Sequence, residues 1–163
     1  MIGEIVMERT LQLLQENARL SNEQIAVMLG KTTEEVAATL DAYEKAGVIC
    51  GYKPLINYEK AQVARASALI ELRVTPRKDT GFDAIAEHIM AFDEVESLYL
   101  MSGSYDLAVT VNAKTMQDIA VFVARRLAPI DGVLSTATHF ILHRYKEAGV
   151  SLQGEEVDER EGQ

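Results

Sequence analysis

The sequence has few of the residues that typify secreted, membrane-spanning or strongly DNA-binding chains. Cys50 is the single cysteine in 163 residues, which excludes an internal disulfide and suits a reducing cytoplasm. No apolar run reaches the roughly 18 residues that a membrane-spanning helix requires. The first residues lack the basic segment and apolar stretch of a signal peptide. We therefore expect a cytoplasmic protein that does not enter a membrane.

Acidic residues outnumber basic ones in every part of the chain. Residues 1–58 contain 5 Lys/Arg and 8 Asp/Glu, residues 59–146 contain 10 and 11, and residues 147–163 contain 1 and 6, which together give the net charge of −9. A nucleic-acid-binding domain normally clusters Lys and Arg, and no such excess is present. Hydrophobic residues make up 48%, enough for a core. The acidic residues 147–163 can bury little, so we expect a disordered tail.

The first third of the chain has helical periodicity with clear start and stop signals. Residues 4–16 carry apolar side chains at helical spacings. Ser21 with Gln24 has the form of a capping box, and Gly30 ends that short second helix. A third helix is expected from Thr32 onward. Its inner face and stop signal are Val36, Leu40, Tyr43 and Gly47. Three short helices with a glycine turn before the third match helix-turn-helix spacing.

Two short apolar runs follow these helices, at residues 48–52 and 55–58, and Lys53-Pro54 separates them. Such a pattern is typical of a small hairpin. After a helix-turn-helix, that hairpin would be the wing of a winged helix. We therefore predict an N-terminal winged helix-turn-helix domain over residues 1–58, followed by a linker at residues 59–64.

From Arg65 onward the apolar pattern changes to a period of two, which predicts a strand through Val74. Helical periods return at residues 82–90 and again after Thr115. Further strands are predicted at residues 95–102, 106–112 and 133–145. The order is β-α-β-β-α-β, the ferredoxin-like split unit with an antiparallel sheet. The fold class is thus α+β, and the second domain spans residues 65–146.

Helices on one face of such a sheet leave the other face for solvent or a partner. The strands place apolar side chains on both faces. We assign to the uncovered face Leu69, Leu98, Leu100, Phe140 and Leu142. Apolar side chains on an uncovered face favour burial against another subunit, so we expect a homo-oligomer, at least a dimer.

Three motifs occur in order along the chain: Arg19-Leu20-Ser21 with residues 25–30, then residues 43–52 (YEKAGVICGY), then Gly103-Ser104-Tyr105-Asp106. Together with the domain plan they resemble the leucine-responsive/asparagine-regulator (Lrp/AsnC) family, over about residues 4–146. The resemblance implies a transcriptional regulator that forms dimers and often octamers or larger rings. It also implies a C-terminal domain that binds amino acids at contacts between dimers.

The start of the third helix and its surroundings supply the candidate contacts to double-stranded DNA. Thr and Lys can donate to phosphates, and a helix N-terminus favours an anion. The candidates are Arg19, Lys31, Thr32, Thr33, Ala37 and Lys53. The outer face of this helix is nevertheless acidic, with Glu34, Glu35 and Asp41, and it cannot supply an Arg-to-guanine pairing. The alternative is an effector-binding or assembly protein of the same fold that binds DNA poorly.

The segment around Gly103 is the candidate effector site. Glycine permits a tight turn and close approach to a ligand. Asp106 can pair with an α-ammonium group, and backbone N–H groups can receive a carboxylate. The residues alone favour an ordinary hairpin turn, whereas the resemblance implies an amino-acid effector. The candidates are Gly103, Ser104, Tyr105, Asp106, Thr136 and Thr138.

No set of residues predicts catalysis, a cofactor or a metal. His139 and His143 lie four apart on a predicted strand, which separates them by about 13 Å and excludes a shared metal there. No nucleophile–base pair, phosphate loop or cysteine cluster is present. Relatives of the family that decarboxylate sirohaem carry a histidine near the hairpin and paired arginines after the wing. This chain has Ser104 and Tyr52-Lys53 there, so we expect no enzymatic activity.

Overall fold

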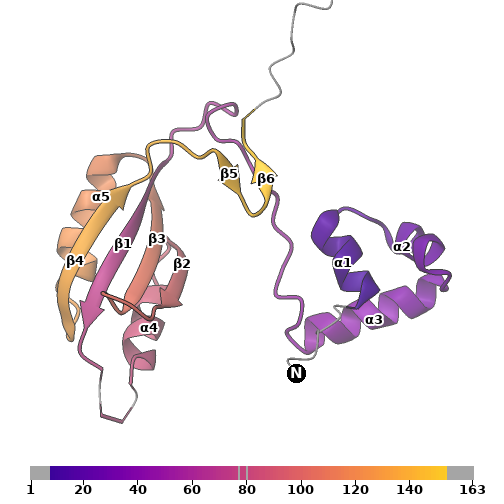
Figure 1. Cartoon of the computed structure of the whole chain (residues 1–163), viewed down its shortest axis with the longest axis horizontal. Helices are drawn as coiled ribbons and strands as arrows, with labels where there is room; N and C mark the ends of the chain where they lie inside the picture. The colour runs from indigo at the N-terminus through magenta and orange to yellow at the C-terminus, as the bar shows by residue number, and fades with distance from the viewer. Residues whose placement is uncertain (1–7, 77, 80, 154–163) are drawn as a thin grey trace, which may run out of the picture. The chain divides into compact units, whose positions relative to one another are not determined.

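The computed structural model describes residues 8–76, 78–79 and 81–153 of the chain. The chain divides into two compact units, Met1–Pro54 and Leu55–Gln163, and Figure 1 shows their elements in chain order. This division falls four residues before the predicted boundary at residue 58. Among the described residues, no helix is long and apolar enough to cross a membrane.

Three helices make up the first unit: α1 Arg9–Glu16, α2 Asn22–Leu29 and α3 Thr33–Lys45 (Figure 1). They enclose a small core formed by Leu14, Ile25, Ala26 and Val36. The start of the predicted first helix, at residues 4–7, lies outside the described residues. The helix begins at Arg9, because the Glu8 side chain accepts a hydrogen bond from the Thr10 N–H at 2.9 Å and caps it.

Both predicted capping boxes are present, and they determine where α2 and α3 begin. Ser21 Oγ accepts from the Gln24 N–H at 3.2 Å, and Gln24 Oε1 accepts from the Ser21 N–H at 2.9 Å. Thr32 and Glu35 make the same reciprocal pair. α2 ends at Gly30, whose φ of 64° lies in the left-handed region that favours glycine. The predicted helix-turn-helix is therefore confirmed.

The prediction of two strands for the wing, at residues 48–52 and 55–58, is wrong. The described residues contain no strand between α3 and Ala66. Pro54 has no N–H to donate to a ladder, and Lys53-Pro54 is not one of the glycine- or asparagine-containing turns that favour tight hairpins. Leu55 and Ile56 remain 44% exposed, so burial supplies little to hold a pair of strands together.

The second unit has the predicted β-α-β-β-α-β order. Its elements are β1 Ala66–Val74, α4 Asp83–Met90, β2 Val95–Leu100, β3 Leu107–Ala113, α5 Met116–Phe122 and β4 Val133–Phe140, and a π-helical turn, η1 Val123–Leu127, extends α5. The strands pair antiparallel in the order β2-β3-β1-β4. This order is that of a ferredoxin-like sheet, as the sequence predicts.

The core of this unit lies between the sheet and the helices that cover one of its faces (Figure 1). Alternate residues of β1 and β3 enter it, and they are Ala68, Ile70, Leu72, Leu107, Val109 and Val111. Ile85 and Ile89 of α4 and Ile119 and Phe122 of α5 pack against them. The period of two from residue 66 therefore correctly identifies the buried side of β1.

The end of the last strand and the tail differ from expectation. β4 ends at Phe140, five residues before its predicted end, and beyond it the Ile141 N–H still donates to Ser67 O of β1. The first residues of the predicted tail, from Glu147 onward, form a hairpin together with Lys146, and its strands are β5 Lys146–Glu147 and β6 Val150–Ser151. Its turn holds Ala148 and Gly149 at positive φ, as a type I′ turn requires. Residues 154–163 lie outside the described residues.

The strand register contradicts part of the prediction for the uncovered face of the sheet. Leu98 pairs with Val109, and Phe140 pairs with Ala68. Both partners are core residues and paired residues share a face, so Leu98 and Phe140 lie on the helix-covered side. A register shift between Val95 and Ser97 sets the alternation of β2, and the sequence pattern does not reveal it.

Leu100 pairs with the buried Leu107 and also lies on the helix-covered side. Leu142 lies beyond the end of β4. Of the five predicted side chains, Leu69 alone lies on the uncovered face, where it pairs with Thr110 and His139. The assignment of the other four was wrong, and the uncovered face is more polar than predicted.

Candidate functional site

The outward face of α3 is the first candidate site. Val36 is buried at 1% exposure, and Leu40 and Tyr43 lie half-buried on the same side. The exposed residues of the opposite side recur at spacings of three and four, which place them in one stripe along the helix. They are Glu34, Ala37, Ala38 and Asp41, and Lys45 continues the stripe at the end of the helix, where it is paired with Asp41. α3 therefore presents small and acidic side chains outward.

Lys31, Thr32 and Thr33 lie together at the start of this helix, as predicted. Lys31 and Thr32 are exposed, and Thr33 is half-buried. Lys31 Nζ lies 3.8 Å from Glu8 Oε1, and Thr32 Oγ1 accepts a hydrogen bond from the Glu35 N–H. The Lys31 charge predicted to contact DNA is thus already partly directed to a carboxylate within the unit.

Arg19 and Lys53 lie on other segments of the first unit. Arg19 is exposed in the connection before α2, where its backbone N–H donates to Asn17 Oδ1 at 3.0 Å. Lys53 is exposed in the segment after α3. Both side chains are accessible, and they lie outside the stretch of chain that forms the start of α3.

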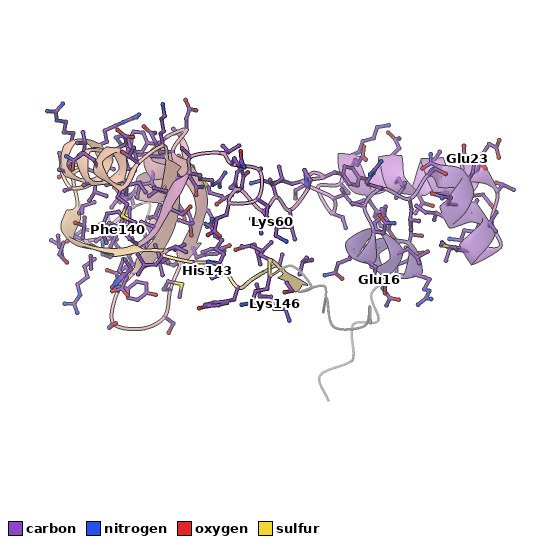
Figure 2. All side chains as sticks on the ribbon, turned by 90° about the horizontal axis from the view of Figure 1, so that it is seen from above. Glu16, Glu23, Lys60, Phe140, His143 and Lys146 are labelled. Carbon is purple, nitrogen blue, oxygen red and sulfur yellow. The ribbon has the colours of Figure 1, made fainter. Side chains whose placement is uncertain are left out.

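The carboxylates of α3 differ in what they contact. The Thr32 backbone N–H donates to Glu35 Oε2 at 2.8 Å, and this bond, with the Thr32 hydroxyl, holds the Glu35 pKa below its usual value. Asp41 Oδ2 accepts from Lys45 Nζ at 2.6 Å. Glu34 makes no hydrogen bond or ion pair with any residue that the structure describes. Further carboxylates, Glu16 and Glu23, project from α1 and α2 (Figure 2).

The second candidate site is the connection between β2 and β3. Asp106 fastens this connection to the end of β1: its Oδ2 accepts from the Val74 N–H at 2.8 Å, and its own N–H donates to Leu72 O at 2.9 Å. Its carbonyl accepts from the Met101 N–H at 2.8 Å. The carboxylate that the motif assigns to an effector is therefore also a structural acceptor.

Gly103 does not have the conformation that the sequence suggests. Its φ lies outside the left-handed region, and a Cβ placed on it would meet no atom within 4 Å. The turn thus does not require glycine there. Open space beside Gly103 remains compatible with the approach of a ligand. Ser104 is exposed, and Tyr105 is half-buried.

Thr136 and Thr138 do not join this cluster within one chain. They pair with Leu72 and Ile70 of β1, whereas β3, which Asp106 precedes, pairs along the other edge of β1. β1 therefore separates the two threonines from Asp106. The six predicted effector residues form two groups on either side of the central strand.

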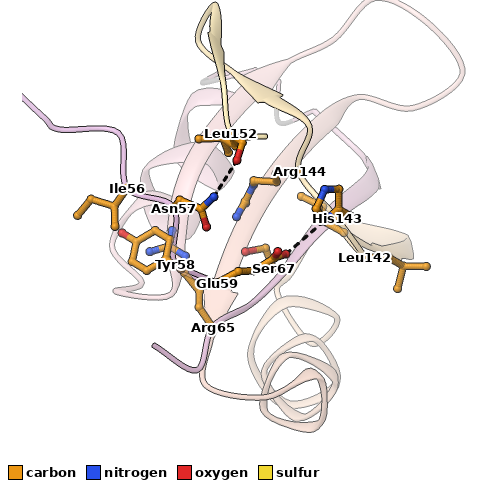
Figure 3. A pocket seen from close by; sticks show the side chains of 11 residues that line it. Ile56, Asn57, Tyr58, Glu59, Arg65, Ser67, Leu142, His143, Arg144 and Leu152 are labelled. Carbon is orange, nitrogen blue, oxygen red and sulfur yellow. Dashed lines mark hydrogen bonds and ion pairs between the residues drawn. The ribbon is translucent and has the colours of Figure 1, made fainter. Parts of the chain in front are cut away.

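A small cavity of about 90 Å³ lies at the opposite end of β1 (Figure 3). The Arg65 guanidinium lies 4.2 Å from the centre of the Tyr58 ring, and Arg144 lines the cavity beside them. Asn57 Nδ2 donates to Leu152 O at 2.8 Å. The volume holds about three waters and falls below that of ordinary ligand pockets. Nothing in the sequence pattern signals this cavity, because its residues come from segments far apart in the chain.

Two of the three histidines lie near carboxylates of the second unit. His139 Nε2 lies 3.4 Å from Glu71 Oε1, and His143, which lies after β4 rather than on it, has Nδ1 3.3 Å from Glu59 Oε1. No group of three or more His, Cys, Asp or Glu within the described part of the chain is placed to hold a metal ion.

Comparison with known protein families matches both units. Residues 7–49 match the model of a winged helix-turn-helix DNA-binding domain, and residues 67–151 match that of the Lrp/AsnC ligand-binding domain. These two matches coincide with the three-helix unit and with the sheet that carries Asp106.

Individual relatives resemble the chain over nearly its whole length. It is 43% identical to YugG of Bacillus subtilis, an uncharacterized HTH-type transcriptional regulator, over 92% of this chain and 91% of that protein. It is 25% identical to the leucine-responsive regulatory protein of Haemophilus influenzae, over 85% and 83%. A transcriptional regulator of Neisseria meningitidis, solved as a complex with L-Met, has the same fold, with a TM-score of 0.69, 24% identity and coverage of 90% and 97%.

Proposed function

Because the chain belongs to the Lrp/AsnC family of HTH-type transcriptional regulators, we propose that it controls transcription by placing α3 in the major groove of double-stranded DNA. The observation that carries the proposal is the helix-turn-helix itself, with two complete capping boxes and an exposed outer face on α3. A protein with this function works in the cytoplasm, where the DNA is, and needs no catalytic group.

The proposed DNA contacts divide into positioning and base-facing groups. Lys31 and Thr33, at the start of α3, contact phosphates together with the N-terminal end of the helix, and Thr32 helps to hold that end in shape. Arg19 and Lys53 contact phosphates from the neighbouring segments. Ala37 faces the bases. Few cations are present, so each unit is expected to bind DNA weakly and to lose affinity only gradually as salt rises.

An electrophoretic mobility shift on DNA upstream of the chain's own coding sequence tests this function. Sequence-preferring binding at low salt that weakens at physiological salt is the expected result. Lys31→Ala and Lys53→Ala should weaken binding to all sequences alike, because phosphate contacts carry no base information. An absence of binding even at low salt would favour the alternative, an effector-binding or assembly protein whose α3 does not contact DNA.

We further propose that an amino acid or a similar small molecule binds at the β2–β3 connection. The Asp106 carboxylate would take the α-ammonium group, and exposed backbone between Gly103 and Tyr105 would take the carboxylate. The relative solved with L-Met supports this class of effector. Since β1 separates Thr136 and Thr138 from Asp106, a second copy of the chain would have to bring both groups to one ligand, which favours a site between subunits.

A thermal-shift screen with the amino acids tests the effector proposal. An effector present at about 100 times its Kd stabilises the folded state by roughly 2.7 kcal/mol, so its midpoint shift should be easily measured. Asp106→Asn is the matched variant, because it keeps an oxygen for the Val74 N–H and removes the charge. If no amino acid raises the midpoint of the unmodified chain, the role assigned to Asp106 as a ligand residue is wrong.

The proposed regulator is a homodimer that assembles further, to an octamer or a larger ring. The uncovered sheet face, with Leu69 at its centre, is the proposed dimer contact. Tyr99 supports this assignment. It pairs with Ala108, which alternates with core residues along β3, so Tyr99 lies on the uncovered face, where it is 59% exposed. Exposed aromatic side chains are typical of subunit contacts.

A further inference from the structure

We propose that α3 recognises its operator through cytosine amino groups and thymine methyl groups rather than through guanine, with Glu34, Ala37 and Ala38 as the base-contacting residues. This inference rests on the proposed function, since it presumes that α3 enters the major groove. The acidity of α3 then determines which bases it prefers instead of excluding DNA binding.

Helix geometry selects the residues that reach the bases. Glu34, Ala37, Ala38 and Asp41 follow the spacing i, i+3, i+4 and i+7 and are all exposed, so they share one face. Val36, Leu40 and Tyr43 face the core of the unit on the other side. The N-terminal residues of a recognition helix make most base contacts in helix-turn-helix proteins, and Glu34 lies one residue after the start of α3.

The three carboxylates near this face are not equivalent. The Glu35 carboxylate is committed to the capping box, and Lys45 neutralises Asp41 at 2.6 Å. Glu34 alone among them has no bonded partner within the described residues. Its side chain is thus the one carboxylate of the stripe that is available to accept a hydrogen bond from DNA.

The chemistry of the major groove determines which base suits each side chain. A carboxylate can only accept hydrogen bonds, and the cytosine N4 amino group is the donor that Glu and Asp pair with. Guanine presents the acceptors N7 and O6, which repel Glu34. Ala37 and Ala38 add two methyl groups beside it, and alanine methyls pack against the thymine C5-methyl. The face therefore matches a short run of cytosine and thymine on one strand.

The same carboxylate explains how weak affinity and selectivity can coexist. At any position without a donor, Glu34 is unpaired beside the phosphates, and that repulsion penalises incorrect sequences more than the correct one. Arg19, Lys31 and Lys53 lie outside the stripe, so phosphate attraction and base selection come from separate residues. Discrimination against the wrong base at the Glu34 position should be roughly 5- to 150-fold.

Selection of binding sites from a randomised duplex library, with the full-length chain at low salt, tests the inference. The unmodified chain should select cytosine at one position of each half-site, flanked by thymine. Glu34→Gln should change that preference from cytosine to adenine, because glutamine pairs with adenine N6 and N7. Glu16→Gln is the control, because it removes the same charge from the exposed end of α1. It should raise affinity for all sequences slightly and leave the selected motif unchanged.

Base analogues in the selected site separate the two contacts. N4-methylcytosine at the Glu34 position, and uracil in place of the flanking thymine, should each weaken binding of the unmodified chain. If Glu34→Gln selects the same motif with the same preference for cytosine, this inference is overturned while the proposed function stands. If the unmodified chain binds no duplex at low salt, the proposed function fails and the inference fails with it.

Discussion

Asp106 is a hydrogen-bond acceptor within the fold and a proposed effector ligand, and a stability measurement separates the two roles. Its Oδ2 accepts the Val74 N–H at 2.8 Å beside a buried strand end. Asp106→Ala leaves that donor without its acceptor, and we expect a loss of about 1–2 kcal/mol in the free energy of unfolding, in the absence of any ligand. Asp106→Asn should lose much less. Urea unfolding of the full-length chain checks this, and equal stability of all three proteins would show that the bond does not matter to the fold.

Two glycines of the second unit should differ strongly in how much stability an alanine substitution costs. Gly132 has a φ of 93°, and an added Cβ would lie 2.9 Å from Ile85 Cδ1. Gly132→Ala should therefore destabilise the unit by about 1–3 kcal/mol, through backbone strain and a clash with the core. Gly103→Ala should change stability by less than about 0.5 kcal/mol, because nothing occupies the space beside it. Thermal unfolding of the two variants compares them, and a larger loss for Gly103→Ala would contradict the described turn.

At the scale of elements, what the sequence predicts correctly is local. Thr32 and Glu35 are three residues apart, so their capping box can be identified without knowledge of the rest of the fold. The period of two in β1 likewise identifies its core side. The β-α-β-β-α-β order, and the family resemblance through the Gly103–Asp106 motif, follow from such local signals.

What the sequence does not predict depends on partners distant in the chain. The last pair of β4 with β1 joins Phe140 to Ala68, and Leu98 faces the helices because of a register shift in β2. The Asp106–Val74 bond joins residues 32 positions apart. The acidic composition of residues 147–163 also hides the structural roles of the apolar Val150 and Leu152. Val150 lies in β6, and the Leu152 carbonyl accepts a hydrogen bond from Asn57.

The start of α3 should weaken in acid. In the folded state the backbone and side-chain hydrogen bonds of Thr32 hold the pKa of Glu35 below its usual value, so the ionised carboxylate stabilises the helix fully above its unfolded-state pKa. The contribution is lost as pH falls through the lowered folded-state pKa. Amide hydrogen exchange of α3 in the full-length chain, compared with Glu35→Gln at each pH, measures it. The greater protection of α3 in the unmodified chain, relative to Glu35→Gln, should disappear in acid. A difference in protection that stays constant with pH would contradict the stabilising role of the Glu35 carboxylate.

At the scale of the whole molecule, the charge distribution predicts that the proposed assembly contributes to DNA binding. The first unit has five basic residues, of which Lys31 and Lys45 are paired with carboxylates. Each phosphate contact adds about 0.9 to the slope of log affinity against log salt, so one unit alone should show a shallow slope and low affinity. Subunits joined through the second unit would present several copies of α3 to one duplex.

Linking weak sites can raise affinity by roughly 10²- to 10⁴-fold without any new contact, so a duplex with two half-sites should bind far more tightly than one with a single half-site. Leu69→Lys places a charge at the centre of the uncovered sheet face and should reduce the mass in solution to the 18.0 kDa of one chain. The variant should lose the advantage of the second half-site but keep its affinity for a single one.

Met90→Lys, on the exposed side of α4, is the control and should retain both the dimer and the higher affinity for two half-sites. Light scattering measures the mass, and mobility shifts measure the affinity for each of the two duplexes. If the Leu69→Lys chain is monomeric and still prefers the duplex with two half-sites, assembly is not the source of the affinity.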